Sequence, residues 1–315
     1  MKRWILIALA TLSLSSMEAQ TAPRVDHHQH LFGPDIVKLS GVSASSITAS
    51  DLVALLDSAG IRRALILSVA YMYGNPNKPP VENEYQKVKA ENDWTSQQIA
   101  RFPDRLRGFC GFNPVKDYAL AELARCAKDQ YLHSGVKMHF GNSDIDLHNP
   151  KHVEKLRQVF HAANANRMPI VVHLRSSVTR HRPHGRAEAE IFLKDVVPSA
   201  PDVPIQIAHL TGAGGYDAAT DDALSVFVDA IARQDPRAKN LYFDVSGGVA
   251  SGLSDSTAKL VATRIRQIGI NRILYGSDGA VPGNTPREAW AAFRRLPLTN
   301  AEFDTIANNV ATYMR

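Results

Sequence analysis

The sequence has few long apolar runs, and after its first twenty residues none approaches the roughly 20 apolar residues that a membrane-spanning helix needs. The chain opens with "MKRW", the apolar stretch "ILIALATLSLSS" and then "MEAQTAP", which is the order of a secretory signal peptide. No cysteine follows this stretch, which argues against a bacterial lipoprotein anchor. We expect residues 1–19, or up to about residue 22, to be a cleaved signal peptide. The mature protein would then be exported, periplasmic or secreted, without a membrane span.

Blocks of like charge are also absent. The 36 Lys and Arg residues outnumber the 31 Asp and Glu residues, giving a formal charge of +5, but they are dispersed along the chain. This distribution argues against a nucleic-acid-binding arm or an acidic tail. We therefore expect a small-molecule substrate, anionic if the positive balance matters, and no nucleic-acid partner. A homo-oligomer remains compatible with this composition.

Cysteine is scarce, with only Cys110 and Cys126 in 315 residues. Cys110 lies in an expected strand and Cys126 in the helix that follows it, so the two side chains can meet. An oxidising compartment would permit a disulfide between them. The alternative is two buried free thiols, which behave as small apolar side chains.

No linker, repeat or low-complexity segment interrupts the chain after residue 24, so we expect a single domain over residues 24–315. Eight strand-like segments each precede a helical pattern. They are residues 24–32, 63–70, 106–112, 133–140, 168–174, 203–210, 240–247 and 272–278. This alternation predicts an α/β fold, the (β/α)8 or TIM barrel, for which such a length is ordinary. A doubly wound open sheet is the alternative.

Titratable side chains gather where these expected strands end. The first strand contains "VDHHQH", in which period-2 alternation places His28 and His30 on one face. The other strand-end residues are Lys137, His139, His173, His209 and Asp278. A single histidine at a strand end is commonly a satisfied core residue, and Asp26 can be a buried carboxylate bonded to backbone. Several such groups at one rim of a barrel instead indicate a shared metal, since neutral imidazole is a common metal ligand.

The motif "DHHQH" resembles the Asp-x-His-x-His opening of the amidohydrolase superfamily. The segments "GVKMHF", "IVVHL", "IQIAHL" and "ILYGSD" look most like its amidohydrolase-related branch of TIM-barrel metal-dependent hydrolases. The resemblance covers residues 24–315. It implies a metal-dependent enzyme, and the branch includes hydrolases, lactonases and non-oxidative decarboxylases.

Carried over to this chain, the resemblance implies one divalent metal held by four side chains, His28, His30, His173 and Asp278. Zinc is expected, with manganese, iron or cobalt as possibilities. Asp278 would also handle the proton of the attacking water, and His209 would polarise the substrate or hold the water. A two-metal arrangement would need Lys137 as a bridge, and we expect Lys137 to face the substrate instead.

Arginines follow the fifth expected strand in the loop "RSSVTRHRPHGR". Arg175 is nearest the strand end and can capture a carboxylate with two parallel hydrogen bonds. We expect Arg175, together with His139 and Lys137, to bind substrate, whereas Arg182 and Arg186 fit a solvated basic loop.

These features predict a metal-dependent hydrolase that activates water for attack on the carbonyl of a small lactone, amide or ester, itself bearing a carboxylate. One alternative is a metal-dependent, non-oxidative decarboxylase of a small aromatic or unsaturated acid. Another is a non-catalytic binding barrel. The sequence does not separate hydrolysis from decarboxylation.

Overall fold

The computed structural model describes residues 21–40, 46–281 and 283–315. The expected signal peptide lies outside the described residues. Among those that are described, no helix combines the length and the apolar character needed to cross a membrane.

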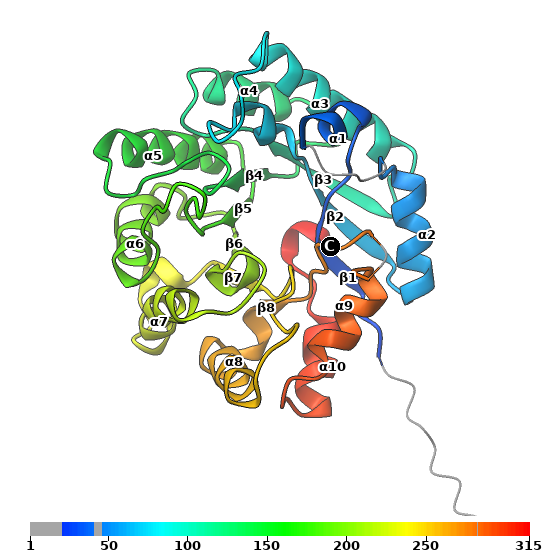
Figure 1. Ribbon diagram of the computed structural model, residues 1–315, viewed down its shortest axis with the longest axis vertical. Helices are drawn as coiled ribbons and strands as arrows, with labels where there is room; N and C mark the ends of the chain where they lie inside the picture. Colours follow the sequence, from blue (N-terminus) through cyan, green and yellow to red (C-terminus); the bar gives the residue numbers. More distant parts are fainter. Residues whose placement is uncertain (1–20, 41–45, 282) are drawn as a thin grey trace, which may run out of the picture.

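Eight parallel strands form a single sheet in the order β1 to β8, which confirms the (β/α)8 barrel (Figure 1). The strands are Val25–Gln29 (β1), Arg63–Leu67 (β2), Leu106–Gly111 (β3), Val136–His139 (β4), Ile170–His173 (β5), Ile205–Ile207 (β6), Leu241–Asp244 (β7) and Ile273–Leu274 (β8). Backbone hydrogen bonds join the two ends of this sheet. His27 donates to the carbonyl of Tyr275 at 2.8 Å, and Asp278 donates to that of His28 at 2.9 Å. The sheet is therefore a nearly closed barrel and not a doubly wound open sheet.

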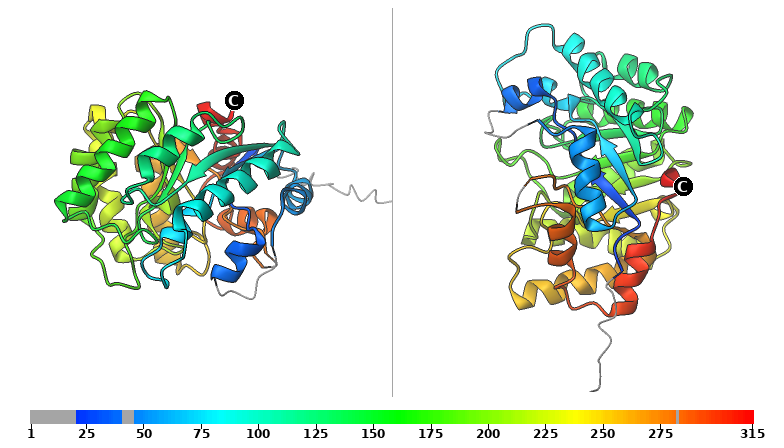
Figure 2. Two further views of the ribbon diagram at one scale, coloured as in Figure 1. Left: turned by 90° about the horizontal axis from the view of Figure 1, so that it is seen from above. Right: turned by 90° about the vertical axis from the view of Figure 1, so that its right-hand side faces the viewer.

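Helices surround the barrel on its outside (Figures 1 and 2). They are Pro34–Ser40 (α1), Ala49–Ala59 (α2), Glu84–Ala100 (α3), Ala119–Cys126 (α4), Pro150–Ala165 (α5), Arg186–Ile191 (α6), Ala218–Ala232 (α7), Asp255–Ile268 (α8), Pro286–Phe293 (α9) and Asn300–Asn308 (α10). Short 3-10 segments are Ala70–Gly74, Val197–Ser199, Ala208–Thr211, Pro236–Ala238, Ile270–Arg272 and Thr312–Met314, and Phe192–Val196 is a π-helical turn. Helix α2 shows how the sequence sets these bounds, because Thr48 and Asp51 form a capping box and Gly60 ends the helix in the left-handed conformation.

The main apolar core lies between the sheet and the helices, and a second cluster fills the barrel interior. The interior cluster includes Val25, Leu67 and Phe109 together with Tyr313 and Met314 from the C-terminus. The chain end therefore closes the barrel at the end opposite to the strand C-termini. The last α-helix, α10, ends at Asn308, and the residues after it pack into the barrel.

Cys110 of β3 and Cys126 of α4 form a disulfide, which settles the alternative left open by the sequence. Both cysteines are buried. The bond ties the third strand to the helix that covers it. Two other local features were not expected: α1 follows the first strand, and the helix after the fifth strand changes to a π-helical turn at Phe192.

Candidate active site

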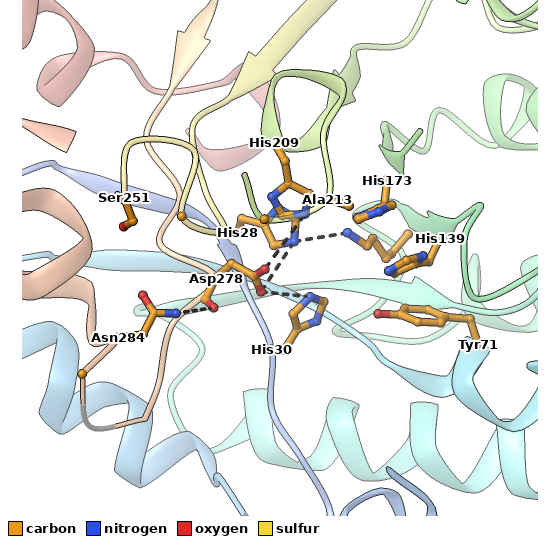
Figure 3. A pocket seen from close by; sticks show the side chains of 15 residues that line it. His28, His30, Tyr71, His139, His173, His209, Ala213, Ser251, Asp278 and Asn284 are labelled. Atoms are coloured by element: carbon orange, nitrogen blue, oxygen red, sulfur yellow. Dashed lines mark hydrogen bonds and ion pairs between the residues drawn. The ribbon is translucent and has the colours of Figure 1, made fainter. Parts of the chain in front are cut away.

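A cavity of about 490 Å³ opens at the C-terminal ends of the strands (Figure 3). Its lining contains all but one of the site residues expected from the sequence, namely His28, His30, Lys137, His139, His173, His209 and Asp278. Tyr71 and several glycines complete the wall. The prediction that these strand-end side chains lie together is therefore confirmed, because in a barrel the C-terminal ends of the strands surround one cavity.

His28 is held by a buried carboxylate that the sequence analysis did not single out. Its Nδ1 lies 3.0 Å from Oδ2 of Asp244, the last residue of β7. Gln206 also donates to Oδ2 of Asp244, at 2.5 Å. Because a carboxylate accepts, His28 carries its proton on Nδ1, and its Nε2 presents a lone pair to the cavity.

The rings of His30 and His209, which also lie near Asp278, have the same orientation as that of His28, with Nδ1 hydrogen-bonded to the protein. Nδ1 of His30 donates to the carbonyl of Leu67 at 2.5 Å. Nδ1 of His209 lies 2.9 Å from the hydroxyl of Ser246, which itself donates to Asp244 at 2.5 Å. Both histidines therefore also turn an Nε2 lone pair towards the cavity, and Asp244 fixes two of the three rings directly or through Ser246.

Asp278 lies between these rings. Its Oδ1 is 3.6 Å from Nε2 of His30 and 4.0 Å from that of His28, and its Oδ2 is 4.0 Å from Nε2 of His209. Asp278 adopts the left-handed conformation with φ 50°, and His209 does the same with φ 56°. Non-glycine residues in this region are strained and cluster at functional sites, where the surrounding structure holds them in place.

The space around His209 depends on a glycine. Gly247 has φ +67°, and a Cβ there would lie 2.7 Å from Nδ1 of His209. Any side chain at this position would push the His209 ring away from Ser246. The turn after β7 therefore contributes both the hydrogen-bond partner of His209 and the room for its ring.

The Nε2 atoms of His28 and His30 and the carboxylate of Asp278 are placed so that they could bind a divalent cation. Bonds of 2.0–2.2 Å in a tetrahedral arrangement place two ligand atoms about 3.3–3.6 Å apart. The separation of 3.6 Å between Asp278 and His30 lies at the upper end of that range, and the 4.0 Å between Asp278 and His28 exceeds it by about 0.4 Å. Both are too long for hydrogen bonds. His28, His30 and Asp278 form one group whose donor atoms all lie within 4.8 Å of one another.

The protonation states suit a cation as well. Burial lowers the pKa of His30 to about 3 and that of His209 to about 4, so both rings are neutral near pH 7. Burial opposes ionisation of Asp278, but His28, His30, His209 and Lys137 outweigh it and lower the pKa of this carboxyl. Neutral imidazoles and an ionised carboxylate are the forms that bind metal.

A second convergent group consists of His28, His209 and Asp244. Its atoms are the Nδ1 side of the rings, and hydrogen bonds already occupy them. Asp244 accepts from Gln206, Ser246, the His28 ring and the His209 backbone N–H. We therefore assign Asp244 as the residue that orients the ligands, and the Nε2 side as the metal position.

Of the described residues that line the cavity, Lys137 is the one lysine or arginine, and it is only 1% exposed. Its Nζ lies 3.2 Å from Nε2 of His28. Burial lowers the pKa of Lys137 to about 8, although Asp278 and Asp244 favour the charged form. The ammonium is thus held at the same lone pair that a metal would use.

His139 and His173 form one wall of the cavity. Their rings stack with centroids 3.8 Å apart, and Tyr71 packs against His139 at 5.1 Å. His173 is not part of either convergent ligand group among the described residues. The assignment of His173 as a metal ligand therefore stays a prediction, as does substrate binding by His139.

Arg175 does not reach the cavity. Its Nη1 lies 2.9 Å from Asp217 and 3.2 Å from the hydroxyl of Thr220, and Asp217 caps the start of α7. This ion pair gives Arg175 a structural role in which it joins the loop after β5 to α7. Arg182 is likewise paired with the buried carboxylate of Asp144, and Arg186 with the exposed Asp222.

Two site residues were missed by the sequence reasoning, Asp244 and Ser246. The signal was present, because "NLYFDVSG" was recognised as a strand and Asp244 is its final residue. Asp26 was described as a buried carboxylate bonded to backbone, and it does accept from the N–H groups of His28 and Ser277.

A family model described as amidohydrolase matches residues 25–311, which is most of the chain, so the chain belongs to the amidohydrolase family. The chain is thus an enzyme of the amidohydrolase superfamily with a divalent metal site. A search of curated proteins finds no match.

Solved structures with the same fold include the 5-carboxyvanillate decarboxylase of Sphingomonas paucimobilis. It is 16% identical with a TM-score of 0.63, and the match covers 91% of this chain and 96% of that one. A dihydroxybenzoic acid decarboxylase of a Polaromonas species, with bound manganese and the inhibitor 2-nitroresorcinol, is 16% identical with a TM-score of 0.62 and coverages of 91% and 95%. A probable 2-pyrone-4,6-dicarboxylic acid hydrolase of Acinetobacter baumannii, with citric acid bound, is 17% identical with a TM-score of 0.58 and coverages of 91% and 96%.

Proposed function

We propose that the protein is a metal-dependent hydrolase of a small carboxylate-bearing lactone, amide or ester. The observation that carries this proposal is the position of Asp278, whose two oxygens face the Nε2 atoms of His30 and His209 across gaps of 3.6 and 4.0 Å. An ionised carboxylate in that position can accept a proton from a water molecule in the cavity. Hydrolysis requires such an acceptor, whereas decarboxylation requires a proton donor for the carbon that loses carbon dioxide.

The chain's own residues divide the work as follows. His28, His30 and Asp278 would hold the metal, which when bound supplies Lewis acidity and lowers the pKa of water. Asp278 accepts the proton of the attacking water and returns it to the leaving group. His209, whose ring is fixed by Ser246, positions the water or the attacked carbonyl. We take the metal to be a single zinc ion, with manganese, iron or cobalt able to use the same ligands.

Lys137 is the residue that we expect to recognise the substrate carboxylate. In this structure Nζ of Lys137 lies 3.2 Å from Nε2 of His28. If that nitrogen held the metal, the Lys137 ammonium would need another partner in the cavity, and a substrate carboxylate would offset its buried positive charge. Arg175 is not needed for this role, because Asp217 already neutralises it.

Decarboxylation of a small aromatic acid is the second candidate. The stacked rings of His139 and His173, 3.8 Å apart and inclined by 15°, give the cavity a flat wall suited to a planar substrate. Two of the similar structures named above are also decarboxylases of aromatic acids. In that reaction Asp278 would have to carry the proton delivered to the substrate carbon.

A substrate panel separates these candidates. We would measure ring opening of carboxylated lactones, hydrolysis of matched amides and esters, and carbon dioxide release from hydroxybenzoates, each before and after metal removal. The proposal predicts metal-dependent hydrolysis of carboxylated substrates without carbon dioxide. Carbon dioxide release as the main reaction would establish the decarboxylase, and binding without turnover on any substrate would indicate a non-catalytic barrel.

We also propose that the protein is exported and that residues 24–315 act as one domain. The leader-like residues 1–19 support export. The Cys110–Cys126 disulfide supports an oxidising compartment. Fractionation of cells that express the full chain, with N-terminal sequencing of the product, would test both the location and the cleavage point.

A further inference from the structure

Arginines gather at the end of the barrel opposite to the active site, where the first three strands begin. Arg24 precedes β1, Arg62 precedes β2 and Arg63 is its first residue, and Arg107 is the second residue of β3. The strand register pairs Val25 with Arg63 and Leu65 with Arg107. Neighbouring parallel strands therefore bring these guanidinium groups to one patch, which we call the arginine base and define as Arg24, Arg62, Arg63 and Arg107.

The arginine base has little opposing charge. Arg107 donates to the carbonyl of Tyr313 at 2.8 Å, and in the described part of the chain no carboxylate forms an ion pair with any member of the base. Partial burial, followed by the charges of Arg107, Arg62 and Arg24, lowers the pKa of Arg63. Like charges this close repel one another, and a bound anion would offset that repulsion.

A cavity of about 580 Å³ lies within the patch. Three of the four arginines line it, together with Asp104, Gly60 and residues 22–23. A neighbouring cavity of about 170 Å³ shares Arg63 and Asp104 with it and adds Arg107. Among the residues that the structure describes, Asp104 is the one acidic residue that lines these two cavities. The space is ample for a phosphate group and leaves room for what the phosphate carries.

We propose that the arginine base binds a phosphate group. Guanidinium forks match phosphate oxygens with pairs of hydrogen bonds, and a dianion balances more of the excess charge than a single carboxylate. The group could belong to a free phosphate or phosphate ester, or to the headgroup of an anionic phospholipid. The proposal does not rest on the hydrolase assignment, because the active site opens at the other end of the barrel.

The test uses the mature chain and a double variant, Arg24→Ser with Arg62→Ser, both exposed positions. The control is Arg157→Ser with Arg287→Ser, which removes the same charge from exposed positions on the outer helices α5 and α9. Thermal unfolding is followed with inorganic phosphate or chloride at equal ionic strength, and calorimetry gives the phosphate affinity. Cosedimentation with phosphatidylglycerol or phosphatidylcholine vesicles forms the second arm.

We expect wild type and control to bind phosphate saturably, and the double variant to bind at least about tenfold more weakly, since charged hydrogen bonds are lost. Binding of phosphate in solution without vesicle binding supports a free phosphate or ester. Binding of phosphatidylglycerol vesicles, lost in the double variant, supports a headgroup. The proposal is overturned if wild type shows neither response, or if the double variant, with an unchanged unfolding temperature in chloride, responds like the control.

Discussion

Nδ1 of His28 donates to the Asp244 carboxylate at 3.0 Å, and this contact joins the first strand of the barrel to the seventh. Both side chains are almost completely buried. The contact fixes the tautomer of His28, so that the ring offers Nε2 to the cavity. It also raises the basicity of that nitrogen, as carboxylate partners of metal-binding histidines do.

Asp244→Asn should weaken metal binding roughly 10- to 100-fold, because the amide no longer draws the Nδ1 proton of His28 as a carboxylate does. Competition with a coloured chelator measures this affinity directly. Asp221→Asn, which removes the carboxylate paired with Arg264 far from the cavity, is the matched control. Unchanged metal affinity in Asp244→Asn would show that His28 is not a ligand through Nε2.

Lys137→Met should separate metal binding from substrate recognition. Removing a positive charge next to His28 should strengthen metal binding, while the loss of a charged hydrogen bond to the substrate should raise KM by roughly tenfold or more for carboxylated substrates. Uncharged analogues should be little affected. If Lys137→Met instead lost its metal, Lys137 would have to be a bridging ligand and the single-metal arrangement would be wrong.

Glu91 predicts a pH dependence of stability that is separate from the active site. Burial raises the pKa of Glu91 to about 8, with Asp35 adding to the effect, and one of its oxygens has no hydrogen-bond partner. The folded state therefore holds the proton more tightly than the unfolded chain, whose carboxyl titrates near 4.5. The free energy of unfolding should fall as pH rises from about 4.5 to about 8, by at most roughly 1.4 kcal/mol per pH unit from this group.

Glu91→Gln should flatten that part of the stability profile and make the protein relatively more stable above pH 8. Urea unfolding at a series of pH values measures the change. Glu154→Gln, an exposed glutamate on α5, should leave the profile as it is. A Glu91→Gln profile parallel to wild type would place the pKa of Glu91 near its ordinary value.

Removal of the disulfide tests how much the tie between β3 and α4 contributes. The two cysteines are 16 residues apart, and closing a loop of that size stabilises a protein by about 3 kcal/mol in the chain-entropy description. Cys110→Ala with Cys126→Ala should lower the free energy of unfolding by about that amount in oxidising buffer. In the presence of a reductant, wild type should lose a similar amount, whereas the variant should not change.

The barrel could be predicted because its signals are local and repeated. Each strand is a short buried run, each helix has an amphipathic pattern, and caps such as Thr48 and Thr299 mark where helices begin. The C-terminal segment could not be predicted in this way. Tyr313 packs inside the barrel and its hydroxyl bonds to Gln206, a contact that depends on the completed fold.

Part of the candidate site could likewise be predicted from local signals, and part could not. His28, His30, His209 and Asp278 were found because strand C-termini meet at one rim. Substrate binding by Arg175 stays a prediction, but its contact with Asp217, 42 residues away along the chain, could not be inferred from its short distance to His173. Asp244 was overlooked because a lone carboxylate ending a strand gives little signal until its neighbours His28 and Ser246 are known.

Turnover measured against added metal tests most directly whether a single cation at His28, His30 and Asp278 activates water. Protein stripped by a chelator should be inactive on every substrate of the panel, and activity should rise with added divalent metal and level off at about one equivalent per chain. Metal-replete Asp278→Asn should then show kcat reduced by at least about a hundredfold. Full activity of the stripped protein, saturation at two equivalents, or near wild-type turnover of metal-replete Asp278→Asn would contradict this mechanism.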